Sequence, residues 1–289
     1  MGKKNSYLGL IIVLVIAIAV LTQSMLKPGS AVPEGSQLII QLQTSAEVPE
    51  ISDRVMERVL AIMEKRVEAL GLSKSAVQSL AEERILLQLP KVADLERVER
   101  VLLSTAQLDF REQLPGTEEQ FPIELQVQRQ LLVERELLPN SGDEEAIAKN
   151  AEALRKANEA IAQFYKEPTL SSQYIEDAFP EPIAGGENWG VGIVFSSEGG
   201  MRFADLTKNI AGTGRTIGIF LDDRLISAPT VGVEFVETGI TGGRAVIQGR
   251  FSAQEAEDLA VQLTSGPLPV PIEILEKRIL APEGEEERN

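Results

Sequence analysis

Short extended patterns alternate with amphipathic helical patterns between residues 36 and 113, and their order restricts the folds open to this chain. In residues 51–70, apolar side chains recur at spacings of three and four and Gly71 follows, which is typical of a helix with one buried face. Strands are expected at 36–44, 76–80, 85–89 and 107–113, and helices at 51–70 and 94–103. The order βαββαβ is the split βαβ arrangement of a ferredoxin-like α+β fold.

An uncharged, mostly apolar segment runs from Leu8 to Leu26. About 20 such residues in a helix cross the hydrocarbon of a bilayer. Lys3 and Lys4 precede the segment and no acidic residue occurs before Glu34, so the positive-inside rule places the N-terminus in the cytoplasm and the rest of the chain outside. We therefore predict a cytoplasmic N-terminus and a single transmembrane helix within residues 1–28.

The stretch that follows, residues 29–36, is rich in Pro, Gly and Ser and is predicted to be a linker. Its small residues at 29–31 also suit a cleavage site, so a cleaved signal peptide is the alternative to a retained anchor. The whole chain carries a net charge of −16 at pH 7, and loss of its N-terminal lysines would leave the exported part more acidic still. Such a body repels polyanions, so we expect no binding to nucleic acid.

Residues 116–186 show a different sequence pattern from the preceding part. Helical patterns at 123–138 and 143–166, parted by the breaker sequence at 139–142, predict a helical hairpin. We interpret it as a polar insertion lying on its own domain, and a partner-binding helix is the alternative. Residues 179–190 are expected to be a loop. Strands are then predicted at 189–195, 215–221, 224–228, 244–248 and 269–275, helices at 197–209 and 252–263, and an acidic tail at 279–289.

The sequence contains no histidine and no cysteine, which excludes most catalytic constellations. A Ser-His-Asp triad, a Cys-His dyad, a thiol redox cycle and a typical zinc site each need one of these residues. The glycine-rich strings complete neither a P-loop nor a dinucleotide fingerprint. Asp222 and Asp223 predict a hairpin turn rather than a carboxylate pair, because neighbouring side chains on an extended segment point apart. We predict no catalytic residue, no cofactor, no metal site and no enzymatic activity.

Four strings, in order along the chain, resemble one known family. They are RVLAIMEKRVEALGLSKSAVQ (58–78), ERILLQLPKVADLERVERVLLSTAQLDFRE (83–112), IGIFLDDRLISAPTV (217–231) and GGRAVIQGRFSAQEAEDLAVQLTSGPLPVPIEILEKR (242–278). They are similar to SecD subunits of the Sec protein-export machinery, and most similar to cyanobacterial members. The third string resembles the family signature LDG-x-x-ISAP at Leu221, Asp222, Ile226, Ser227, Ala228 and Pro229, with Asp223 in place of the glycine.

The resemblance implies a membrane-anchored accessory subunit of protein translocation. It implies a SecF-like subunit and the SecYEG channel as partners, unfolded exported polypeptide as the bound species, and a plasma or thylakoid membrane as the location, with the main domain periplasmic or lumenal. It also implies a ferredoxin-like base at 37–113 and 250–278 with an inserted head subdomain at 114–249 that swings on the base. The expected hinge residues are Glu112, Gln113, Pro115, Gln248, Gly249 and Arg250.

The family also continues beyond its first exported domain with five further membrane helices, which ILAPEGEEERN after Arg278 does not resemble. The intramembrane residues that couple proton flow are therefore not expected within this sequence. A piece of a longer protein, one product of a split gene and an anchored paralogue are the alternatives. An anchored envelope scaffold without a translocation role is the alternative function.

Overall fold

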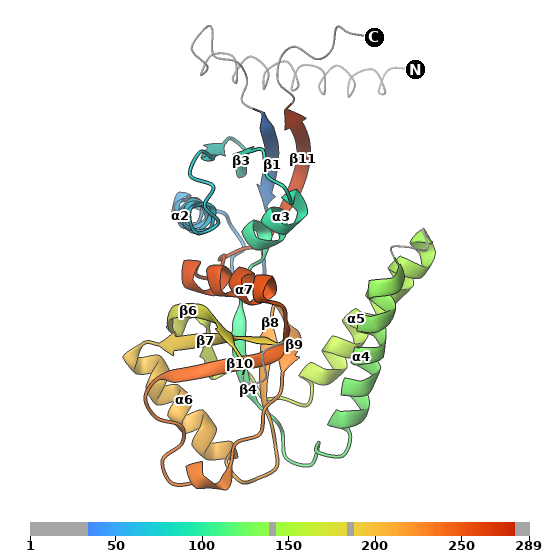
Figure 1. Ribbon diagram of the computed structural model, residues 1–289, viewed down its shortest axis with the longest axis vertical. Helices are drawn as coiled ribbons and strands as arrows, with labels where there is room; N and C mark the ends of the chain where they lie inside the picture. Colours follow the sequence, from blue (N-terminus) through green and yellow to red (C-terminus); the bar gives the residue numbers. More distant parts are fainter. Residues whose placement is uncertain (1–33, 139–142, 184–187, 281–289) are drawn as a thin grey trace, which may run out of the picture.

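The computed structural model describes residues 34–138, 143–183 and 188–280 (Figure 1). The transmembrane helix expected at 8–26, most of the linker at 29–36, the breaker at 139–142 and the tail beyond 280 lie outside these ranges. Across the described ranges, no helix is both long and apolar enough to span a bilayer.

One end of the body, here called the base, is a four-stranded antiparallel sheet in the order β11-β1-β3-β2. Its elements are β1 (Gly35–Leu42), α2 (Asp53–Ala69), β2 (Ala76–Leu80), β3 (Arg84–Pro90), α3 (Leu95–Leu103) and β11 (Ile272–Leu280). Ser52 and Asp94 cap the two helices by accepting hydrogen bonds from Val55 N and Arg97 N. Alternate side chains of β1 and β3 pack with the apolar faces of both helices in one core.

The strand pattern alone places the fourth strand of the base at 107–113, whereas the family resemblance also implies a closing strand of the base within 250–278. The strand predicted at 107–113 forms as β4 (Leu108–Glu112), but it pairs with β8 (Ile217–Leu221) in another sheet. The edge of β1 is filled instead by β11, with Gly35 opposite Leu280. The βαββαβ order is therefore completed only near the end of the chain, because a local strand pattern does not specify a distant partner.

The rest of the body, here called the head, contains two antiparallel sheets, β10-β7-β6 and β5-β4-β8-β9. Its further elements are α4 (Phe121–Leu137), α5 (Glu144–Ala162), β5 (Leu170–Ser171), η2 (Ser172–Tyr174), β6 (Ile175–Pro182), β7 (Trp189–Phe195), α6 (Ser197–Ile210), β9 (Arg224–Ser227), η3 (Val233–Phe235), β10 (Arg244–Phe251) and α7 (Ala253–Ser265). Phe110, Phe195 and Phe203 lie at the centre of its core, with ring centroids 5.2–6.2 Å apart.

Helix α7 lies between the base and the head (Figure 1). Its buried side chains, including Leu259 and Leu263, belong to the head core. It also contacts α2 and α3 of the base. The closing segment expected as one base unit at 250–278 therefore divides, because α7 buries its apolar face against the head while β11 enters the base sheet.

Strand β6 takes in residues 179–182 of the loop expected at 179–190 and forms an edge of the β10-β7-β6 sheet. Both backbone groups of Ala178 bond the hydroxyl of Thr264, with Ala178 N 3.1 Å and Ala178 O 3.2 Å from Thr264 Oγ1, so they face away from β7. Alternate residues of a strand share this direction, so the nitrogens of Pro180 and Pro182 also face outward. Neither can donate a hydrogen bond.

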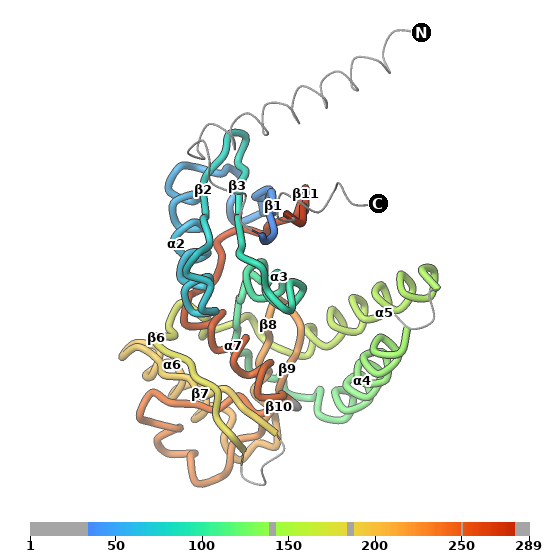
Figure 2. The backbone as a smooth tube through the Cα atoms, turned by 45° about the horizontal axis from the view of Figure 1, so that its top comes forward, coloured from blue at the N-terminus to red at the C-terminus, as the bar shows by residue number. Residues whose placement is uncertain are grey.

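Helices α4 and α5 form the predicted hairpin and extend away from the sheets, as Figure 2 shows. Polar bonds join them, from Asn150 Nδ2 to Leu131 O at 3.0 Å and from Gln128 Nε2 to Asn158 Oδ1 at 2.8 Å. Near its attachment, Tyr165 packs between Phe121 and Phe220 in a small separate core. The hairpin thus rests on the head through its lower end.

Candidate functional site at the junction of base and head

Within the described residues, the backbone passes between base and head at two places. The first crossing, Ser104–Gln107, leads from α3 to β4, and the second, Gly266–Pro271, leads from α7 to β11. A backbone hydrogen bond joins them, from Leu268 N to Thr105 O at 2.8 Å. The junction therefore consists of two short segments that lie side by side. Their contacts determine the orientation of the head relative to the base.

Arg66 of α2 binds both crossings from the base side. Its side chain has no exposed surface. Nη1 donates to the carbonyl oxygens of Val101, Leu102 and Ser104 at 3.1, 2.9 and 2.5 Å, and Nη2 donates to Gly266 O at 3.2 Å. These acceptors belong to the C-terminal ends of α3 and α7, where the helix dipole favours a cation. Burial lowers the pKa of Arg66 to about 10, and the nearby charge of Asp222 opposes this shift.

Asp222 binds the first crossing from the head side. It lies in the two-residue turn between β8 and β9, where Asp222 and Asp223 have φ of 50° and 59°. The sequence prediction of a hairpin turn here is confirmed. One carboxylate oxygen accepts from Gln107 N at 3.0 Å and from the hydroxyl of Thr105, and the other accepts from Ser104 Oγ at 3.1 Å.

The neighbouring Asp223 has a different partner, so the two carboxylates do not act as a pair. Asp223 lies 2.9 Å from a guanidinium nitrogen of Arg111, which also binds Asp109 at 2.8 Å. The same guanidinium lies 4.4 Å from the centroid of the Phe220 ring. Asp223 therefore anchors the turn to β4 within the head.

Helix α7 carries a separate set of polar contacts to the base. Arg97 of α3 pairs with Asp258 at 2.7 Å and with Glu257 at 3.2 Å. Gln262 Nε2 donates to Arg100 O at 3.3 Å. Since α7 also buries its apolar face in the head core, it is attached on both sides.

The remaining residues of the expected signature lie in and after β9, beside the turn. Ser227 Oγ donates to Gln248 O at 2.8 Å and so ties β9 to β10. Pro229 O accepts from Ile217 N at 2.8 Å. Ile226 packs against the head core, and Ala228 packs against the small core below the α4–α5 hairpin. The signature therefore builds the hairpin that presents Asp222 to the junction.

The residues expected as a hinge lie inside the head rather than in the two crossings. Glu112 ends β4, pairs with Lys166 at 2.6 Å and accepts from Asn209 at 3.1 Å. Gln113 is 1% exposed, and its side-chain oxygen accepts from N and Oγ1 of Thr216, each at 2.9 Å. Pro115 follows in the next loop, and Gln248, Gly249 and Arg250 lie within β10 at its irregularity.

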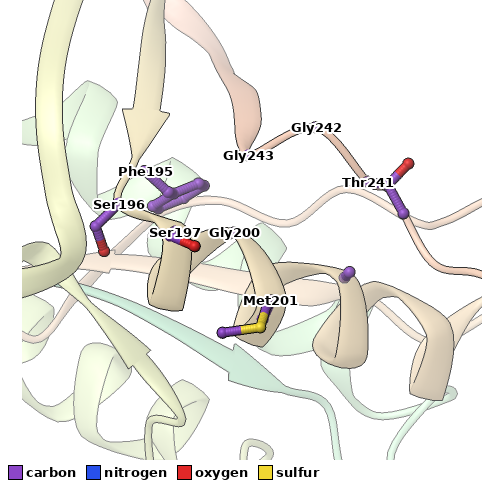
Figure 3. A pocket seen from close by; sticks show the side chains of 9 residues that line it. Phe195, Ser196, Ser197, Gly200, Met201, Thr241, Gly242 and Gly243 are labelled. Carbon is purple, nitrogen blue, oxygen red and sulfur yellow. The ribbon is translucent and has the colours of Figure 1, made fainter.

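Two open grooves lie near the junction and on the head. The larger, of about 500 Å³, is lined by α2, the β6 edge and α7, with Lys65, Asp177 and Thr264 among its residues. The smaller, of about 340 Å³, lies between the start of α6 and the loop Thr241–Gly243 (Figure 3). Met201 at its rim is 61% exposed. Among the side chains that the structure describes, no three acidic groups converge as metal ligands do.

Arg66 is the junction residue that the sequence analysis missed. A signal existed, because Arg66 lies beside Val67 and one turn from Met63 and Ile62 on the face predicted to be buried. A cation in such a position indicates a buried polar partner. The nature of that partner, a set of distant carbonyl groups, has no sequence signature.

Two family models match the chain. The head subdomain of the SecDF P1 domain matches residues 147–270, and the N-terminal part of the P1 domain of protein translocase subunit SecDF matches residues 56–115. A solved structure of SecDF, a membrane component that enhances protein export, has a TM-score of 0.62 at 25% identity and covers 84% of this chain and 100% of that one. The SecDF structure in the super-membrane-facing form has the same TM-score at 23% identity over 96% of this chain and 35% of that one. The base and head thus define a P1 domain of the SecDF type.

Curated relatives narrow the assignment. The SecD subunit of a Synechocystis species is 45% identical over 283 residues, which is 96% of this chain and 60% of the relative. The SecD subunit of Prochlorococcus marinus is 30% identical over 311 residues, which is 98% of this chain and 63% of the relative. The chain belongs to the SecD family and is similar to its cyanobacterial members. It spans less than two thirds of the length of these relatives.

Proposed function

We propose that this chain serves protein translocation as an accessory part of the SecD type, and that it binds or guides polypeptide as it emerges on the exported side of the membrane. The observation that carries the proposal is the 45% identity to a protein translocase subunit over 96% of the chain, which includes base, junction and head. Partners of this activity would be a SecF-like subunit and the SecYEG channel. The proposed role needs surfaces and a junction rather than a catalytic group.

We further propose that residues 8–26 anchor the chain as a single transmembrane helix, with a cytoplasmic N-terminus and the body periplasmic or lumenal. The pairing of Gly35 with Leu280 supports this orientation, because both ends of the described body lie at one end of the base. The base would then lie next to the membrane, and the head would lie away from it (Figure 1).

The division into moving parts follows from the two crossings. We propose a base of residues 35–103 and 272–280 and a head of residues 108–265. The hinge expected from the sequence at Glu112–Pro115 and Gln248–Arg250 stays a prediction. The crossings Ser104–Gln107 and Gly266–Pro271 are a second candidate, since they are the places where described backbone connects the two parts.

Site-specific photocrosslinking in intact membranes tests the proposed function. A photoreactive residue is placed at Met201, on the rim of the head groove, and a matched one at the exposed Glu57 of α2. We expect crosslinks from position 201 to an exported precursor that disappear when its export is blocked, and few from position 57. A single stoichiometric partner outside the Sec machinery, with no precursor captured from either position, would support the scaffold function instead.

A further inference from the structure

We propose that Asp222 is a positioning residue that fixes the orientation of the head on the base by holding the Ser104–Gln107 crossing against the β8–β9 turn. The proposal builds on the two-part body described under the proposed function, and it concerns the junction alone. It is carried by the contacts that the crossing makes on its two sides.

On the base side, the crossing is held in the protein interior. Arg66 donates to Ser104 O and to two carbonyl groups of α3, and its side chain is fully buried. A buried charge-assisted bond is expensive to break, because the carbonyl groups would lose their partner without gaining water. The crossing therefore stays with the base.

On the head side, the same crossing is held in contact with solvent. Asp222 and Gln107 are exposed, and the carboxylate bonds to Ser104 Oγ, Thr105 Oγ1 and Gln107 N lie at the surface. Water replaces such partners at little cost, so these bonds open before those of Arg66. The bonds to Asp222 are therefore the contacts through which the crossing can separate from the head.

Opening of these bonds leaves the two parts joined through α7. This helix keeps its apolar face in the head core and its contacts from Arg97 and Gln262 to the base. The head can then turn about α7 while the short crossing flexes. With the Asp222 bonds closed, the crossing and α7 connect the parts at two places and a rotation about either one is blocked.

The test measures the distance between base and head in the full-length chain in detergent. Since the sequence has no cysteine, Glu57→Cys on α2 and Lys208→Cys on α6 give one specific pair for spin labels, and both positions are exposed. The distance distribution is recorded for the parent pair, for Ser104→Ala with Thr105→Val, and for Asp222→Asn. Asp223→Asn is the matched control, because its carboxylate binds Arg111.

We expect the Ser104→Ala/Thr105→Val protein and the Asp222→Asn protein to broaden the distribution about twofold or to add a second distance. The Asp223→Asn protein should match the parent. Identical distributions in all four proteins would overturn the proposal, as would equal broadening in the control. Circular dichroism checks that each variant is folded. Asparagine tolerates the left-handed backbone of the turn, so Asp222→Asn removes the carboxylate without disrupting the turn. Because no precursor is present, this result stands apart from the crosslinking test of the proposed function.

Discussion

Arg66 Nη2 lies 3.2 Å from the carbonyl oxygen of Gly266, 200 residues further along the chain. This bond joins the last turn of a base helix to the end of the helix that completes the head core. One buried guanidinium thus holds the ends of α3 and α7 together at the junction.

Replacement of Arg66 by methionine should lower the free energy of unfolding by about 3 kcal/mol, because several buried carbonyl groups lose their donor. Arg58→Met is the control, since Arg58 lies exposed on the same helix, and its change should stay within about 0.5 kcal/mol. Urea denaturation measures both. Equal stability of the two variants would show that the carbonyl groups find other partners.

Tyr165→Phe should change the pH dependence of stability. Burial raises the pKa of the Tyr165 phenol, although its hydrogen bond with Thr216 acts in the opposite direction. The folded phenol keeps its proton above pH ~10, where the unfolded chain loses it, so stability present below that pH is lost as the pH rises further.

The Tyr165→Phe variant has no phenol to ionise, so it does not lose stability in this way at high pH. It also lacks the hydrogen bond to Thr216 Oγ1, which is 2.7 Å long. We expect it to be about 1 kcal/mol less stable near neutral pH, with a gap that narrows above pH ~10. Urea midpoints over that range give the difference, in which all shared titrating groups cancel. A gap that stays constant would place the pKa of Tyr165 at its ordinary value.

Glu83→Gly should stabilise the base by about 1 kcal/mol. Glu83 has a φ of 59° in the β2–β3 turn, a conformation that is unfavourable for a residue with a Cβ atom and free of strain for glycine. Glu64→Gly is the opposite control, because Glu64 is exposed within α2 and glycine costs about 1 kcal/mol there. Thermal unfolding should move the two midpoints in opposite directions.

Gly239→Ala should cost more than Gly214→Ala, although both glycines have a left-handed backbone. A Cβ at Gly239 would lie 1.8 Å from Ala204 O of α6, whereas one at Gly214 meets nothing within 4 Å. We expect about 1 kcal/mol for Gly214→Ala from backbone strain, and about 3 kcal/mol for Gly239→Ala, where the loop must also move off the helix. Similar losses of stability for the two variants in a urea titration would show that backbone strain alone accounts for both losses.

Local patterns were sufficient where local physics decides the structure. The helix predicted at 252–263 forms as α7 and begins with a capping box of Ser252 and Glu255, and the predicted Asp222-Asp223 turn forms. The loop expected at 179–190 was wrong over β6, because Pro180 and Pro182 suggest a breaker unless the strand lies at an edge.

Local sequence patterns do not identify contacts between residues that are far apart in the sequence. The sequence of β4 does not indicate that it pairs with β8 rather than β1, since the alternation of Leu108 and Phe110 shows only that one face of the strand is buried. The junction was missed for the same reason. The resemblance identified Asp222 as part of a signature, but its partners Ser104 and Thr105 lie 118 and 117 residues away in sequence.

The outward edge of β6 has a consequence for any extended polypeptide that approaches it. An extended polypeptide that approaches this edge finds the amide of Ala178 occupied by Thr264 and no amide hydrogen at Pro180 or Pro182. Between these residues it cannot add itself as a further strand, and so it cannot use the head as a template for growth of a cross-strand aggregate. At residues 178, 180 and 182 this edge therefore offers an approaching chain side chains but no free amide hydrogen.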